Sequence, residues 1–185
     1  MTRTTEGRAD MHEHEELFRP WGTVTPAFWG APALAPAAQT GPQAQIPEVL
    51  RERLAAVVAA ATGGQLQDAA WMAYQLDIEI AAECGVEHLN TVHIREVRGH
   101  IAHLMDDHAT ALGWYLHAAR LRATIQGPGH PDTEEATRRV YGLWRTVPAH
   151  DARRLGNELL AAVTDIHGSE AAVAQRTLKR LQSLD

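Results

Sequence analysis

The chain of 185 residues has one cysteine and one lysine, and runs of β-branched residues are scarce. The single cysteine, Cys84, excludes an internal disulfide and a zinc site built from cysteines. It lies in an apolar helical stripe, so the sequence predicts a small buried residue rather than a nucleophile. The scarcity of β-branched runs, together with abundant alanine, predicts an all-α protein.

Long apolar segments and a surplus of positive charge are also missing. The longest apolar run, 54–61, is far shorter than the roughly 20 residues that cross a bilayer, and the first residues contain no apolar signal segment. The net charge of −6 is spread along the chain and offers no basic surface for nucleic acid or an anionic membrane. We therefore expect a cytoplasmic protein without direct nucleic-acid or membrane contacts.

Residues 1–46 differ in composition from the rest of the chain. They are rich in proline and alanine and show no helical periodicity beyond Phe18, which predicts a largely irregular segment. Four of the ten aromatic residues nevertheless fall within it: Phe18, Trp21, Phe28 and Trp29. This aromatic cluster is either padding for the protein's own surface or a short motif for a partner, and the sequence favours neither.

Residues 47–185 carry the helical patterns. Pro47 suits the first turn of a helix, and apolar residues then recur at intervals of three and four between glycine or proline breaks. Ser169 is the expected N-cap of the last helix. The predicted helices are 48–62, 65–84, 88–105, 106–126, 131–148, 151–166 and 169–184.

A repeat organises this helical part. The glycine, histidine and threonine of Gly85-Val86-Glu87-His88-Leu89-Asn90-Thr91 return 42 residues later in Gly127-Pro128-Gly129-His130-Pro131-Asp132-Thr133. Two helical patterns lie between the copies. A period of this length is typical of stacked helix pairs.

The middle pair, 88–126, carries a glycine in its first helix and an Ala-x₃-aromatic motif in its second: Gly99, then Ala111 and Tyr115, with Ala118 at the next small position. With these residues the chain resembles the tetratricopeptide repeat family. The longer period and the His130–Thr133 start are similar to its kinesin-light-chain branch, which is common in bacterial regulatory and signalling proteins. The resemblance implies a short α-solenoid of three helical hairpins with a C-terminal capping helix.

The other pairs match the motif less well. The first, 48–84, matches through Gly64 and Ala69. The third, 130–166, has Tyr141 at the position of Gly99 and Asn157 at that of Tyr115.

The resemblance also implies a binding groove, because first helices line the concave face in this family. Its register places a polar stripe of the third predicted helix in the groove, namely His93, Glu96, His100 and His103, with Asp107 continuing the spacing of three and four. The following first helix would add Glu135, Arg138 and Arg145.

Three interpretations of this stripe stay open. It is a solvated helix face, or a groove for a peptide or small molecule, or a metal site in which His100 and His103 are joined by Glu96 and Asp107. Several imidazoles on one face would also gain charge near pH 6–7, which suggests pH sensing. The recurrent turn histidines, such as His88 and His130, are expected to cap or pack. Trp71, Trp114 and Trp144 are expected to pack between repeats.

No motif for catalysis is recognisable: there is no nucleophile elbow, phosphate-binding loop or zincin motif. We predict a non-enzymatic regulatory or scaffolding module without a cofactor, which binds a peptide segment of another protein through His93, Glu96, His100, His103, Arg138 and Arg145. A homodimer is compatible with the sequence. The aromatic cluster of residues 1–46 could fold back to compete with the partner or dock on a neighbouring molecule. Alternatives are a ligand-sensing accessory subunit of a bacterial transcriptional regulator and a histidine-rich metal-binding helical protein.

Overall fold

The computed structural model describes residues 47–184, and within them every regular element is a helix. The all-α class is therefore confirmed, and the predicted helix bounds agree to within about three residues at most ends. The proline-rich segment 1–46, with Phe18, Trp21, Phe28 and Trp29, lies outside the described residues. The helices are α2 Glu48–Thr62, α3 Leu66–Cys84, α4 Leu89–Leu104, α5 His108–Gln126, α6 Pro131–Thr146, α7 Ala149–His167 and α8 Ala172–Gln182.

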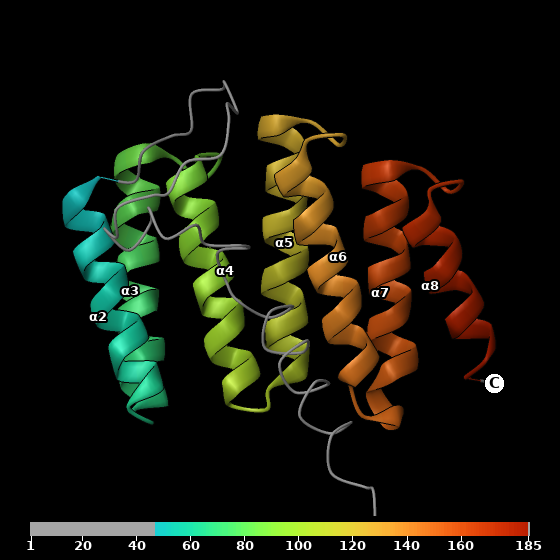
Figure 1. The fold of residues 1–185 in the computed structure, drawn as a ribbon. Helices are drawn as coiled ribbons and strands as arrows, with labels where there is room; N and C mark the ends of the chain where they lie inside the picture. Colours follow the sequence, from blue (N-terminus) through green and yellow to red (C-terminus); the bar gives the residue numbers. More distant parts are fainter. Residues whose placement is uncertain (1–46, 185) are drawn as a thin grey trace, which may run out of the picture.

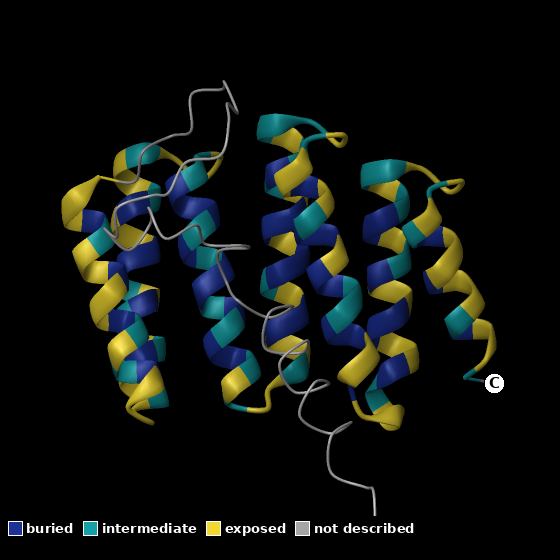
Figure 2. Ribbon diagram, viewed as in Figure 1, coloured by how far each residue is buried: buried dark blue, intermediate teal, exposed yellow. Residues whose placement is uncertain are grey.

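The helices follow one another across the molecule in sequence order from α2 to α8 (Figure 1). Each helix packs on the helix before and after it, and α5 and α6 also reach α7 and α8, respectively. Buried residues lie on the faces that helices turn toward their neighbours, and exposed residues lie on the outer faces (Figure 2). Among the described residues, no helix is both long enough and apolar enough to cross a membrane.

Glycines at the ends of α3, α5 and α7 set the period of the chain. Gly85, Gly127 and Gly168 have φ values of 97°, 95° and 84°, and the N–H of each bonds to the carbonyl four residues back. This backbone conformation is available to glycine at little cost and strained for other residues. The helix ends predicted at Gly85 and Gly127 are thus confirmed, and Gly168 ends α7 in the same way.

The next helix has its N-cap three residues after each of these glycines, at His88, His130 and Ala171. The expected N-cap at Ser169 is therefore wrong. The backbone turn at Gly168 fixes the start of α8, and the capping preference of Ser169 does not override it. By this register α8 takes the place that α4 and α6 occupy in their own copies.

A glycine lies against an aromatic ring both between α4 and α5 and between α6 and α7, but on opposite helices of the two pairs. A Cβ on Gly99 of α4 would lie 3.2 Å from Cδ2 of Tyr115 on α5. A Cβ on Gly156 of α7 would lie only 2.5 Å from Cζ2 of Trp144 on α6. In the α6–α7 pair the ring is on the first helix and the glycine on the second, the reverse of α4–α5. Alignment by period alone missed this, because it compared Asn157, which is exposed, with Tyr115.

The three tryptophans do not share one role. Trp144 is buried, and its indole Nε1 donates to the Ala152 carbonyl at 2.7 Å, as expected for packing between helices. Trp71 is 62% exposed, so the packing expectation is wrong for it. Trp114 is half-buried beneath the Arg98 guanidinium. Cys84 is half-buried beside the core of α2–α4, close to its predicted environment.

Candidate functional site

The acidic member of the predicted groove is buried. The Glu96 side chain is 1% exposed and accepts two hydrogen bonds from Arg122 of α5, Nε to Oε1 at 2.8 Å and Nη2 to Oε2 at 2.9 Å. Arg139 of α6 adds Nη1 at 3.8 Å from Oε1. The expectation that Glu96 lines an open groove is therefore wrong. Helical spacing correctly put it on one face of α4, but arginines of the next two helices cover that face.

This arrangement keeps the carboxylate charged. Burial raises the pKa of Glu96, but the Arg122 and Arg139 guanidinium groups outweigh burial, and the net pKa is lowered. Burial likewise lowers the pKa of Arg122, and the Glu96 carboxylate more than compensates and raises it. A buried ion pair of this kind joins α4, α5 and α6 and is costly to break on one side.

The histidines of the same stripe are held neutral. Burial of the His93 ring lowers its pKa to about 4, and the Glu96 carboxylate only partly opposes this. Burial, then His103 and Arg139, lowers the pKa of His100 to about 4. The pKa of His103 is also lowered, by burial and by His108. His93 and His100 should therefore stay neutral at pH 6–7, contrary to the charging near that pH expected from the sequence.

His100 packs between helices rather than facing an open groove. It lines a small cavity of about 40 Å³ between α2 and α4, together with Val57 and Ala61. Its Nδ1 atom is buried without a hydrogen-bond partner in the described part of the chain. His103 lies near His108 of α5, with ring centroids 6.2 Å apart.

The structure does not assemble the candidate metal ligands. Both Glu96 oxygens are engaged by Arg122, and Asp107 instead caps α5 by accepting from the Thr110 N–H at 3.0 Å. Within residues 47–184, no group of three or more His, Cys, Asp or Glu side chains could hold a metal ion. The turn histidines behave as expected: Nδ1 of His88 accepts from the Asn90 N–H, and Nδ1 of His130 accepts from the Asp132 N–H.

The predicted arginines, in contrast, are at the surface. Arg138 and Arg145 are both exposed on α6. Arg138 pairs with Glu135, one turn earlier on the same helix. The Arg145 carbonyl accepts from Nη2 of Arg180 on α8, at the weak distance of 3.5 Å.

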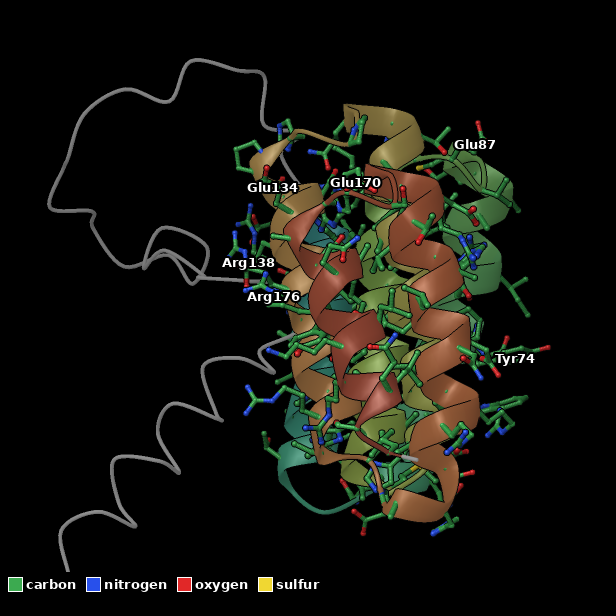
Figure 3. All side chains as sticks on the ribbon, turned by 90° about the vertical axis from the view of Figure 1, so that its right-hand side faces the viewer. Tyr74, Glu87, Glu134, Arg138, Glu170 and Arg176 are labelled. Atoms are coloured by element: carbon green, nitrogen blue, oxygen red, sulfur yellow. The ribbon has the colours of Figure 1, made fainter. Side chains whose placement is uncertain are left out.

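Arg138 borders a cleft that sequence reasoning did not find. The cleft has a volume of about 490 Å³ and lies between the α5–α6 turn, α6, the end of α7 and the start of α8. Figure 3 shows Glu134, Arg138 and Arg176 on the same side of the molecule. The polar residues that line the cleft are Glu134, Thr137, Arg138, His167 and Arg176. The sequence offered one signal for this cleft, the repeat register, in which Arg176 of α8 occupies the position that Glu135 occupies in α6.

Hydrogen bonds fix the chemistry of the cleft wall. The Thr137 hydroxyl donates to the Thr133 carbonyl at 2.9 Å, so its oxygen is left to accept from Nε2 of His167, also at 2.9 Å. Since a hydroxyl has one proton, His167 must carry hydrogen on Nε2. Burial lowers the pKa of His167, while Glu134 opposes this.

Arg176 is the most available cation of the cleft. Its Nε donates to the Ala172 carbonyl at 3.1 Å, and its guanidinium carbon lies 5.9 Å from the Tyr141 ring centroid. No carboxylate of residues 47–184 forms a salt bridge with it. Arg138, the other cation that lines the cleft, pairs with Glu135, and Glu134 is the carboxylate of the lining.

The chain matches no protein-family model and no curated protein.

Proposed function

We propose that this protein is a non-catalytic interaction module of the cytoplasm, with regulatory or scaffolding work, and that it binds an acidic peptide segment of a partner protein in the α6–α8 cleft. The observation that carries the proposal is that Arg138 of α6 and Arg176 of α8 both line one cleft of about 490 Å³. It replaces the groove expected along α4, whose carboxylate is buried.

The chemistry of the two arginines supports an acidic ligand. A guanidinium presents its donors as a planar fork that fits a carboxylate, and charge-assisted hydrogen bonds of this kind are among the stronger polar contacts. Thr137 and His167 are already committed to one another, and Ile166 and Val173 give the cleft an apolar wall. A segment with an acidic residue next to a small apolar one would satisfy both.

The helical arrangement supports the proposal of a tetratricopeptide-like solenoid. Glycine breaks recur at 85, 127 and 168, and three hairpins, α2–α3, α4–α5 and α6–α7, are followed by α8. Solenoids of stacked hairpins bind extended segments along one face. We propose that α4, α6 and α8 are the first-helix positions of such an array, as in bacterial regulatory proteins with this repeat.

A capture experiment tests the site. The full chain, an Arg138→Ala/Arg176→Ala variant and an Arg120→Ala/Arg154→Ala variant would each be used to recover partners from native lysate. The second pair is also exposed and removes the same charge from α5 and α7. A partner bound by wild type and by the control, but lost by the cleft variant, supports the proposal. A partner retained by all three proteins overturns it.

A small-molecule sensor is the second candidate, because the cleft volume falls within the roughly 300–1,000 Å³ typical of ligand pockets. In this form the protein would be the sensing subunit of a transcriptional regulator. A rise in melting temperature with a carboxylate-bearing metabolite, absent in the Arg138→Ala/Arg176→Ala variant, would favour the sensor over the peptide module.

A further inference from the structure

A second surface lies away from the cleft and is built from aromatic and arginine side chains. On α3 the Trp71 and Tyr74 ring centroids are 5.6 Å apart. The guanidinium carbon of Arg98 on α4 lies 5.4 Å from the Tyr74 ring centroid and 3.8 Å from that of Trp114 on α5. Figure 3 shows Tyr74 on the side of the molecule away from Arg138 and Arg176. We call Trp71, Tyr74, Ile78, Arg98 and Trp114 the aromatic surface.

Three large apolar side chains of the aromatic surface are exposed together on one face of α3. Trp71, Tyr74 and Ile78 are 62%, 40% and 49% exposed and stand at positions i, i+3 and i+7 of one helix. Scattered apolar residues on a surface need no explanation, but a contiguous stripe marks an interaction site. Tryptophan and tyrosine beside arginine are also the residues that carry most binding energy at interfaces.

Ion pairs hold this surface in one arrangement. Both oxygens of Asp77, which is buried on α3, are engaged by arginines of α4: Oδ1 by Nε of Arg95 at 3.2 Å and Oδ2 by Nη1 of Arg98. Nη1 of Arg95 also lies 2.7 Å from Nε2 of His117. Two guanidinium groups share one carboxylate, so the cluster carries a net positive charge next to the exposed rings.

The chain contains a segment with the complementary chemistry. Residues 13–29 contain Glu13, Glu15 and Glu16, followed by an aromatic and proline-containing stretch with Phe18, Pro20, Trp21, Pro26, Phe28 and Trp29. Its aromatic and proline residues can stack on Trp71 and Tyr74, as proline-containing segments do on aromatic surfaces. Its acidic end can approach the positive cluster around Arg98. We propose that residues 13–29 dock on the aromatic surface of the same chain.

The connecting chain is long enough. Residues 30–46 join the segment to Pro47, the N-cap of α2. Eighteen steps from Trp29 to Pro47 span up to about 60 Å when extended. The whole of α3, at 19 residues, is about 28 Å long. The extended linker is thus about twice as long as the helix that carries Trp71, Tyr74 and Ile78.

Tethering favours this occupant over a free partner. A segment joined by a short linker is present at an effective concentration on the order of millimolar, so a weak stacking contact is occupied most of the time. An external partner for this surface would then have to displace the segment. The inference concerns a face of the molecule that the proposed peptide module does not use, and it stands or falls independently of that proposal.

Chymotrypsin provides the test, since it cuts after aromatic residues, and mass spectrometry locates each cut. The full chain would be compared with Trp71→Ser/Tyr74→Ser and with a control, Val49→Ser/Val86→Ser, which changes exposed apolar residues elsewhere. We expect cleavage after Phe18, Trp21, Phe28 and Trp29 to be about tenfold faster in the aromatic-surface variant only. Equal cleavage in wild type and this variant overturns the proposal.

A reciprocal measurement keeps the test independent of any folding defect in that variant. Phe18, Trp21, Phe28 and Trp29 would be changed together to serine in the full chain, which leaves the sequence of helices α2 to α8 unchanged. Hydroxyl-radical labelling of Trp71 and Tyr74 should then rise several-fold, and unchanged labelling overturns the proposal. Protection in wild type should be the same at about 1 and 100 μM protein. Protection that grows with concentration would place the segment on a second copy and overturn docking within one chain.

Discussion

Glu96 of α4 and Arg122 of α5 form a bidentate ion pair with hydrogen bonds of 2.8 and 2.9 Å, almost wholly removed from solvent. Replacing Glu96 by glutamine or leucine leaves the Arg122 charge, with Arg139 beside it, in a poorly solvated site. We expect the free energy of unfolding to fall by about 3–5 kcal/mol. Chemical denaturation measures it.

Glu158→Gln is the matched control for that substitution. Glu158 pairs with Arg154 at 3.0 Å, but both side chains are at least half exposed. Its loss should cost no more than about 0.5 kcal/mol. If Glu96→Gln cost no more than Glu158→Gln, the Glu96 pair would have no role in holding the three helices together.

Gly156→Ala should destabilise the contact between α6 and α7. The added Cβ would lie 2.5 Å from Trp144, and the Trp144 ring cannot easily withdraw because its Nε1 is bonded to the Ala152 carbonyl. Overpacking of this kind costs about 1–3 kcal/mol. Gly113→Ala, in the middle of α5, meets nothing within 4 Å and should instead stabilise by about 0.5–1 kcal/mol. Thermal unfolding of the two variants should show shifts of opposite sign.

The half-buried histidines His93 and His100 should make the protein less stable in mild acid. The pKa of His93 and of His100 is about 4 in the folded chain, below the value of about 6.5 expected when unfolded. The unfolded chain thus binds more protons between these values, and stability is full above pH 6.5 and falls as the pH drops toward 4. Each histidine should contribute up to about 1.4 kcal/mol per pH unit. Denaturation between pH 5 and 6.5 measures the slope, and His93→Leu/His100→Leu should flatten it.

The side chain of His130 should contribute to the start of α6. Its Nδ1 accepts from the Asp132 N–H at 3.2 Å, in the place that a serine or aspartate would usually take. His130→Ala should cost about 1 kcal/mol of unfolding free energy. His150→Ala changes a largely exposed histidine at the start of α7 and should cost clearly less. Equal losses would mean that capping by His130 adds nothing.

The helices could be predicted because their signals are local. Apolar spacing, proline at Pro131 and glycine at Gly85 and Gly127 act on the chain within a few residues, so the sequence located α2 to α7 closely. The predicted N-cap of α8, Ser169, lies two residues before the observed N-cap, Ala171. Serine is a preferred N-cap residue, but the backbone turn at Gly168 sets where the helix begins. Local preference and backbone geometry were in conflict there, and geometry prevailed.

The candidate site was less accessible to sequence reasoning. The spacing of His93 and Glu96 correctly gave a shared face of α4, but whether that face is open depends on Arg122 and Arg139, which come from other helices. Burial also moved the pKa of the histidines, which the sequence cannot weigh. Arg138 was predicted to share a groove with Glu96, but Arg138 is exposed on α6 whereas Glu96 is buried. The neighbour of Arg138 across the cleft, Arg176, required the position of α8.

The carboxylates of Asp77 and Glu96 have a further consequence for how the chain opens. Each is shared by two arginines, and together they tie α3, α4, α5 and α6. Of the described helices, α2, α7 and α8 take no part in these networks, and α2 and α8 are also the outermost (Figure 1). Amide hydrogen exchange should therefore follow a gradient, with α4 and α5 exchanging last and α2 and α8 first. At the α6–α8 cleft, motion would then be concentrated in the wall formed by α8, while the wall formed by α6 would move less.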